Sequence, residues 1–376
     1  MLTRLRHVRR DERGMAFVYV GLGFMGFLAA TTLAIDVGMF MTARSQAQNS
    51  ADAGALAGAT SLALNSFSDR SPGGPAVSSA VSTALANPVI KANVSVTPSD
   101  VTFPNTNGLN DLVKVDVYRT AQRGNPIPTL MGVLFGVSQV DITATATAEA
   151  APANAMTCVK PFMIPDKFID VNGNGAYDLN VDTYIDGTDP THYTGYTTTN
   201  DIGTPLVLRA GNQNSVQPSF YYSWKMPGDI GGNFYRDNID QCNQSIISYD
   251  PNNPYLMTQE PGDKQGPTVQ GILDLIAQDP HTQWNSTCMC VTGSNFSGQS
   301  PRVFPIPLFN PYYYATGKAN GRPASFELAN FLGFYADYVE ANGQIHGIIT
   351  NITGLIDANG GPAPATMFPR AIRLVQ

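Results

Sequence analysis

The chain has 376 residues, which allows two domains or one large one, and 43% of its residues are hydrophobic while only 14% are charged. The net charge is −7, and without the first 13 residues, which hold five Arg and two acidic residues, it is 17 basic against 27 acidic residues, or −10. This acidic balance argues against nucleic acid as a partner. The 35 glycines and 27 prolines indicate a globular but loop-rich protein.

An uncharged apolar run occupies residues 15–35, directly after a basic N-terminus with five arginines. As a helix, its 21 residues would span about 31 Å, close to the thickness of a hydrocarbon core. The positive-inside rule then predicts a cytoplasmic N-terminus at residues 1–14, a single pass through the inner (cell) membrane, and an extracytoplasmic C-terminus. A cleaved secretory signal is the alternative, but its apolar region is shorter and does not continue as helix. Asp36 is expected at the outer edge, with its carboxylate in reach of water.

Alanines recur at every fourth position after this run, and two glycines lie beside them. At a spacing of four, side chains share one helix face, and small ones let two backbones approach closely. An ordinary Ala-rich helix lying on its own domain is the alternative. Both arrangements hold in a pilin-like helix, whose outer half packs on a globular head while its inner half packs on neighbours. The helix-packing surface predicted from the pattern consists of Ala47, Ala51, Ala55, Ala59, Gly54 and Gly58.

Residues 36–150 are predicted to contain this helix and a small α+β unit. A break rich in Ser, Gly and Pro at 65–75 separates the long helix from a short one at 76–86. Alternating or continuous apolar residues then predict strands at 93–97, 112–118 and 140–148 and a helix at 128–135.

Residues 151–376 differ in composition, because they are rich in Gly, Pro, Asn and Tyr. We expect a second, extracytoplasmic domain that is mainly β, with helices at 267–277 and 326–340. The predicted fold class is therefore α+β, with a long N-terminal transmembrane helix, a small α+β unit and a loop-rich, mainly β exported domain.

All four cysteines, Cys158, Cys242, Cys288 and Cys290, lie in the part predicted to be exported. An oxidising compartment favours disulfides. Because Cys288 and Cys290 are separated by one residue, a bridge between them is not expected, and the two remaining connectivities join Cys158 and Cys242 each to one of that couple. A zinc site is the weaker alternative, since the sequence has neither a CxxC spacing nor histidines clustered with the thiols.

Residues 170–182 match the opening of a calcium-binding loop. Oxygen-bearing side chains stand at positions 1, 3, 5 and 9, with Gly175 at the turn position. Position 12 carries Val181 instead of an acid, and Asp182 follows one residue later. A plain Asn/Gly-rich turn is the alternative. The predicted ligands of one structural calcium ion are Asp170, Asn172, Asn174, Ala176 through its carbonyl, Asp178 and Asp182.

Three elements occur in order near the N-terminus: an apolar anchor, then Asp36-Val-Gly38, then Ala-Arg-Ser-Gln-Ala-Gln-Asn-Ser-Ala-Asp-Ala-Gly-Ala-Leu-Ala-Gly-Ala at 43–59. This arrangement resembles the N-terminal region of the TadE/TadG-like family of Flp (tight adherence) pilus-assembly proteins. Residues 86–150 resemble the next segment of that family, and the remainder resembles its exported region by weaker cues. The resemblance implies a pilus-assembly or envelope component and does not imply catalysis.

The sequence leaves two functions of different classes. One is a membrane-anchored, non-enzymatic component of Flp/Tad-type pilus assembly or of the envelope, whose helix meets other Tad/Flp membrane proteins or pilins and membrane lipid. The other is a membrane-tethered hydrolase or carbohydrate-binding protein with its site in the aromatic, acidic C-terminal region. No catalytic residue is predicted, because the sequence lacks nucleophile-elbow, P-loop and metalloprotease motifs. A cleft with paired carboxylates would favour the second function, and a protruding helix the first.

Overall fold

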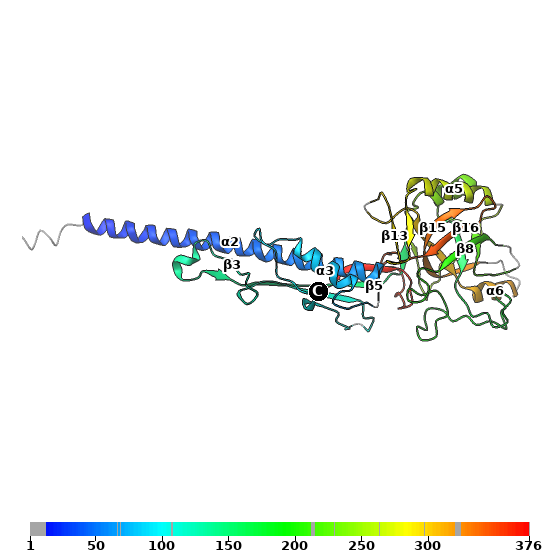
Figure 1. Ribbon diagram of the computed structural model, residues 1–376, viewed down its shortest axis with the longest axis horizontal. Coiled ribbons are helices and arrows are strands. Elements are labelled where there is room, and N and C mark those ends of the chain that lie inside the picture. Colours follow the sequence, from blue (N-terminus) through cyan, green and yellow to red (C-terminus); the bar gives the residue numbers. More distant parts are fainter. Residues whose placement is uncertain are drawn as a thin grey trace, which may run out of the picture.

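The computed structural model describes residues 13–65, 67, 69–106, 108–211, 215–228, 230–262, 264–296, 298–319 and 325–375. The molecule is elongated, with a long helix that projects from one end and a globular body at the other (Figure 1). We distinguish the anchor, residues 14–35; the rod, which comprises residues 36–152 and 370–375; and the head, residues 153–369. The predicted α+β class, with a long N-terminal apolar helix followed by a mainly β domain with a few helices, is confirmed.

The long helix α2 runs without a break through Arg13–Leu64. It contains no proline, and it changes character along its length. Its side chains at residues 14–28 are all exposed, whereas from Ala43 to Ala63 every fourth residue is buried. The helix ends against the head, where the Asn351 side-chain amide donates a hydrogen bond to the Leu64 carbonyl at 2.9 Å.

The rod is built from α2, the short helix α3 (Pro75–Leu85) and one antiparallel sheet. Proline at the first position of α3 suits a helix start, because its missing N–H would have no intrahelical partner there. The sheet has the order β1-β2-β5-β17, with β1 at Val101–Thr102, β2 at Leu112–Arg119, β5 at Ile142–Pro152 and β17 at Arg370–Val375. A 3₁₀ turn, η1 (Pro98–Asp100), leads into β1.

A hairpin leaves the sheet between β2 and β5 and extends along α2 towards its N-terminus (Figure 1). Its strands are β3 (Ile127–Pro128) and β4 (Gln139–Val140), which pair antiparallel. The turns η2 (Ala121–Arg123) and η3 (Gly132–Phe135) lie before the hairpin and in its tip. The helix predicted at 128–135 is therefore wrong: glycines at both ends of η3 and Pro128 leave room for a single 3₁₀ turn.

Strand β17 returns from the head to the rod, where Arg370 pairs with Pro152 and Val375 with Thr147 of β5. The head is thus inserted between two neighbouring strands of the rod sheet, and β17 crosses the predicted division between residues 150 and 151. An ion pair joins the two strands, with Arg373 Nε 2.7 Å from Glu149 Oε2.

The head is organised around a sheet with the order β11-β15-β14-β7-β9-β8-β16. Because β16 also pairs with β15, six of these strands close into a ring. The ring strands are β7 (Phe162–Pro165), β8 (Pro205–Ala210), β9 (Phe220–Ser223), β14 (Val303–Phe309), β15 (Phe326–Val339) and β16 (Ile345–Ile349), and β11 (Leu256–Met257) extends the edge of β15.

Helices and short strands surround this ring. Helices α4 and α5 pack on each other, and α5 and α6 contact β15. The remaining elements are α4 (Gly232–Asp240), α5 (Gln265–Gln278), α6 (Pro311–Ala319), β6 (Ala155–Met156), β10 (Ile247–Ser248), β12 (Gln283–Asn285) and β13 (Cys290–Thr292).

Most strongly patterned elements match their predictions. The helices at 76–86 and 267–277 and the strands at 112–118 and 140–148 are confirmed as α3, α5, β2 and β5. The strand predicted at 93–97 is reduced to one isolated bridge between Ser95 and Tyr118. The helix predicted at 326–340 is wrong, because these residues form β15. Residues 330–336 of this strand are buried without interruption, so no exposed polar face reveals its period of two.

Candidate functional site

The anchor is the most exposed apolar surface among the described residues. Phe17 is 82% exposed, and Val20 and Met25 are about as exposed, at 70% and 69%. By length and composition, α2 could cross a membrane, although a signal sequence would meet the same criteria. Residues 14–28 of the helix are exposed on all sides, and such an apolar segment is suited to lipid or to other helices.

Asp36 follows the last residue of the anchor, and the sequence does not reveal the hydrogen-bond partners of its carboxylate. The predicted contact with water is wrong, because its side chain is 5% exposed. One carboxylate oxygen accepts from the Leu130 N–H at 3.0 Å and the other from the Gly132 N–H at 2.6 Å, with Met131 N–H at 3.2 Å from the latter. Asp36 thereby holds the hairpin tip against α2.

The alanine stripe packs inside the molecule. Ala47, Ala51, Ala55 and Ala59 are at most 1% exposed and belong to the core of the rod. Gly54 and Gly58 face α3 and β2, and a Cβ added to Gly58 would lie 2.8 Å from Val113 Cγ1 and 3.1 Å from Ala80 Cβ. These six residues therefore form a close-packing surface on their own domain, which leaves partner contacts to other parts of α2.

The predicted disulfide pairing is wrong. The structure joins Cys158 to Cys242 and Cys288 to Cys290. The single residue between Cys288 and Cys290, Met289, has a positive φ of 52°, and this backbone conformation brings the two side chains together. Cys158 also has a positive φ, of 56°, at a turn that faces Cys242.

The predicted calcium loop is closed by its own hydrogen bonds. The Asp170 carboxylate accepts from the Gly173 and Gly175 N–H groups at 2.7 Å, and Asp178 accepts from the side-chain amides of Asn172 and Asn174 at 2.8 and 2.6 Å. Gly173 and Gly175 have φ values of 70° and 78°, as tight turns require.

Asp182 closes the other end of this loop, where it accepts from the backbone N–H groups of Val171 and Asp178. Ala176 donates its N–H to Asn174. The four oxygen-bearing side chains gather on one turn, so their chemistry suits calcium, but the two amides would have to rotate to offer oxygen. Among the described residues, no group of three His, Cys, Asp or Glu side chains is arranged to hold a metal.

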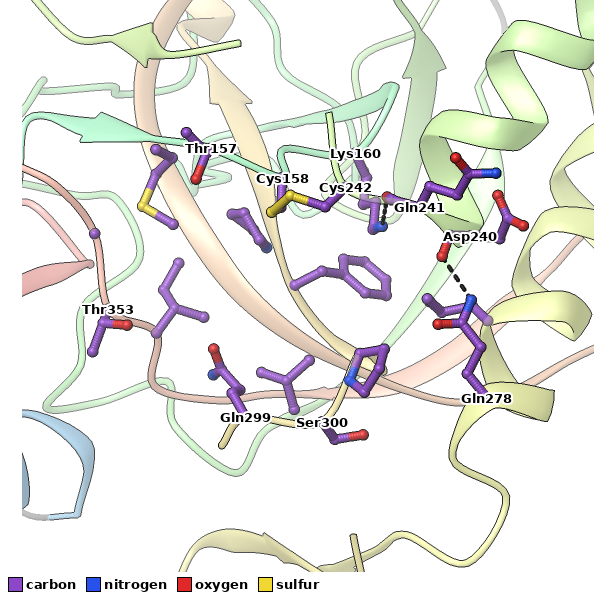
Figure 2. Close-up of a pocket in the computed structure, with 18 of the residues that line it drawn as sticks. Thr157, Cys158, Lys160, Asp240, Gln241, Cys242, Gln278, Gln299, Ser300 and Thr353 are labelled. Atoms are coloured by element: carbon purple, nitrogen blue, oxygen red, sulfur yellow. Dashed lines mark hydrogen bonds between the residues drawn. A yellow bond between two sulfur atoms is a disulfide. The ribbon is translucent and has the colours of Figure 1, made fainter. Parts of the chain in front are cut away.

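The head contains a cleft of about 560 Å³ beside the Cys158–Cys242 bridge. Figure 2 shows Gln299 and Ser300 across the cleft from this disulfide, with Lys160 beside Cys242 and Gln241. The volume suits a small ligand. Asp240 is the one carboxylate in its lining, and Gln278 donates to the Asp240 carbonyl at 2.7 Å.

Lys160 is the most unusual group near this cleft. Its side chain is almost fully buried, and its Nζ donates to the carbonyls of Ile239 and Gln241 at 2.5 and 2.9 Å. Burial lowers the pKa of this amine to about 7. Because these two carbonyls lie at the C-terminal end of α4, the Lys160 amine caps this helix.

Three acidic residues, Asp186, Asp250 and Glu327, line a second, small cleft of about 70 Å³. Pockets that enclose small ligands usually reach about 300–1,000 Å³. The Glu327 carboxylate accepts from the Asn310 side-chain amide at 3.0 Å, so part of this cluster is tied to the fold. This cluster of three acidic residues therefore lies outside the larger cleft, whose lining contains Asp240.

A scan of protein-family models matches residues 14–61 to the family described as putative Flp pilus-assembly TadE/G-like. The match covers 48 of the 376 residues, which are the anchor and most of the rod part of α2. Searches of curated proteins and of solved structures gave no match. The family resemblance inferred from the apolar run, Asp36-Val-Gly38 and the alanine-rich helix is thus confirmed for this segment.

Proposed function

Because residues 14–61 form a TadE/G-like segment, we propose that this protein is a non-enzymatic component of Flp pilus assembly or of the cell envelope. The anchor crosses the inner membrane once. The five arginines before it keep the N-terminus in the cytoplasm. The rod and the head then lie outside.

The observation that carries this proposal is the exposed N-terminal part of α2. Residues 14–28 expose every side chain, although 21 consecutive residues from 15 to 35 carry no charge. Exposure of such an apolar surface to water is unfavourable, so we expect another apolar surface to cover it. Lipid and the helices of other membrane proteins are the partners that cover such a surface without polar groups.

The packing of the rod indicates which part of α2 contacts a partner. Since the alanine stripe is occupied by α3, β2 and β5, other pilus-assembly proteins or pilins meet the anchor itself. Three of its glycines, Gly21, Gly23 and Gly26, have open space where a Cβ would be, so a second helix could approach closely there. The head supplies the exported surface.

A hydrolase or carbohydrate-binding role has less support. A glycoside hydrolase is expected to have a cleft with two facing carboxylates. The larger cleft has Asp240 alone, and the acidic cleft has too little volume for a sugar ring. The buried amine of Lys160 is held by two carbonyls, which supports a structural role.

The proposal is tested by photocrosslinking in cells. A photoreactive amino acid at Phe24, which is 61% exposed on the anchor, should form adducts with another pilus-assembly membrane protein or a pilin. The same probe at Leu374, which is 45% exposed in the rod sheet, serves as the control and should give no such adduct. Adducts with lipid alone at Phe24 would show that the anchor has no protein partner. Protease added to spheroplasts should remove the head, and full protection would overturn the orientation.

A further inference from the structure

The tip of the β3–β4 hairpin, residues 129–138, exposes apolar side chains that no part of the described chain covers. Leu130 is 62% exposed, Val133 57%, Phe135 63% and Val137 50%. The sequence from Gly124 to Val140 carries no charge. Soluble proteins rarely expose so many neighbouring apolar side chains without a partner.

The tip lies beside the last part of the anchor. An apolar groove of about 340 Å³ separates the tip from α2. Its lining includes, on the tip, Thr129, Gly132, Phe135 and Val137 and, on α2, Ala29, Thr32 and Leu33. Ala29 precedes Asp36 by seven residues, which is about 10 Å along a helix. If residues 15–35 fill the hydrocarbon core, the tip lies at the depth of the adjoining leaflet.

Much of the backbone of the tip is hydrogen-bonded within the protein. Lipid-facing irregular backbone does not occur in the hydrocarbon core itself, so a loop that enters a leaflet lies at the headgroup–acyl boundary, where water reaches its remaining polar groups. The N–H groups of residues 130–132 donate to the Asp36 carboxylate. Gly136 donates to Val133, Val137 donates to Gly132 at 3.0 Å, and the Thr129 hydroxyl donates to the Val137 carbonyl at 2.6 Å.

We propose that the apolar side chains of the hairpin tip are inserted into the extracytoplasmic leaflet at its headgroup–acyl boundary, beside the anchor. The inference rests on the proposed function, because it requires α2 to cross the membrane. Lipid is the occupant that the observations favour, since the exposed surface is continuous with that of the anchor at Leu33 and offers no charged group for a specific partner. Two inserted elements fix the rotation and tilt of the rod, which one helix alone cannot do.

Spin-label accessibility in the full-length protein tests this inference. The four native cysteines are paired, so an added cysteine is labelled selectively. The label is placed at Val133 and, separately, at Phe135, and the protein is reconstituted in vesicles of phosphatidylethanolamine and phosphatidylglycerol. Leu22 in the anchor is the lipid control. Leu374 in β17, 45% exposed in the rod sheet, is the water control.

Both tip labels should collide with oxygen more than with a water-soluble nickel chelate, as at Leu22, at a depth of about 5–10 Å below the headgroup boundary. Nickel accessibility equal to that at Leu374, with Leu22 still protected, would overturn the inference and leave the anchor intact. Protection from both reagents would mean that protein covers the tip, which also overturns it. Nickel accessibility at Leu22 would overturn the proposed function as well.

Discussion

The rod and the head are stabilised by different kinds of core. Among the described residues, the buried hydrophobic side chains of the rod are alanine, valine, leucine and isoleucine. The head core is rich in aromatic side chains, among them Trp224, Tyr222, Phe309 and Phe326, which are at most 2% exposed. Small side chains let α2 lie close to α3 and the sheet but bury little area per residue, whereas large rings bury much area. The rod should therefore be sensitive to added volume and the head to lost volume.

The two regions can be followed separately in one sample. Both tryptophans, Trp224 and Trp284, lie in the head, so tryptophan fluorescence reports the unfolding of the head. Far-UV ellipticity is dominated by the 52 residues of α2 and therefore reports mainly the rod and the anchor. Full-length protein in detergent allows both measurements, and non-coincident transitions would show that the regions unfold independently.

The largest effect is expected for Trp224→Ala in the head. The indole is fully buried and donates its Nε1–H to the Lys160 carbonyl at 3.0 Å. The cavity and the lost hydrogen bond should lower the unfolding free energy of the head by about 3–5 kcal/mol. Urea unfolding followed by the fluorescence of Trp284 measures this change. Tyr312→Ala, at a side chain that is 52% exposed, should change it by less than about 0.5 kcal/mol. Similar losses in both variants would mean that the aromatic core is loosely packed.

The buried amine of Lys160 should make the stability of the head depend on pH. In the unfolded chain a lysine remains protonated up to about pH 10, whereas burial lowers the pKa of Lys160 in the folded protein to about 7. Above pH 7 the unfolded state thus binds more protons, so stability rises with pH, by about 2–3 kcal/mol between pH 7 and 9.

The matched variant for this prediction is Lys160→Met, which keeps an unbranched chain of similar reach without the amine. The wild type minus variant difference in unfolding free energy should grow between pH 7 and 9 and stay constant from pH 5 to 6. A difference that is flat over the whole range would mean that Lys160 stays charged when folded.

In the rod, added volume should be the damaging change. Ala51→Leu and Ala55→Leu place three extra carbon atoms at positions with no exposed surface. Each should destabilise the rod by about 1–3 kcal/mol, seen as an earlier loss of helical ellipticity. Asn49→Leu, at an exposed position of the same helix, is the control. If all three variants melt alike, the alanine stripe is not closely packed, and the contrast with the head fails.

The smallest effect concerns calcium and the loop at 170–182, and it stays a prediction from the sequence. With few charged ligands, the affinity should lie near 10⁻⁴–10⁻³ M, that is about the weak extracellular range. Binding to the folded state alone would add about 1 kcal/mol at a few times Kd. The head should melt higher in millimolar calcium than in chelator. Asp170→Ala should abolish the shift and Asp189→Ala, outside the set, should keep it. An unchanged melting temperature at tenfold higher calcium would leave the loop a turn.

Sequence reasoning worked where one side of an element faces water and failed where both sides are covered. Strand β2 alternates between buried and partly exposed residues, so its period of two is visible in the sequence. Strand β15 lacks a polar face, and its apolar residues also fit a helix. The disulfide pairing depends on the backbone at Met289, which spacing alone does not reveal.

For the candidate site, the sequence predicted the anchor, and the alanine stripe as a packing surface, but not which neighbour the stripe would meet. The partnership between Asp36 and the hairpin tip joins residues 94–96 positions apart, so no local pattern contains it. The one usable signal was the uncharged stretch from Gly124 to Val140, within which the sequence predicts a helix at 128–135. Its exposure, rather than its apolar composition, distinguishes it from a core segment.

The pairing of β17 with β5 imposes an order of events on folding. Arg370 pairs with Pro152, so the 218 residues after Pro152, up to Arg370, must be made before the rod sheet is complete. At about 5–20 residues per second this takes about 10–40 s. During that time β5 presents an open edge to its surroundings. Open edges pair readily with foreign strands. A ribosome that stops inside the head would therefore leave a rod with a permanently unpaired strand.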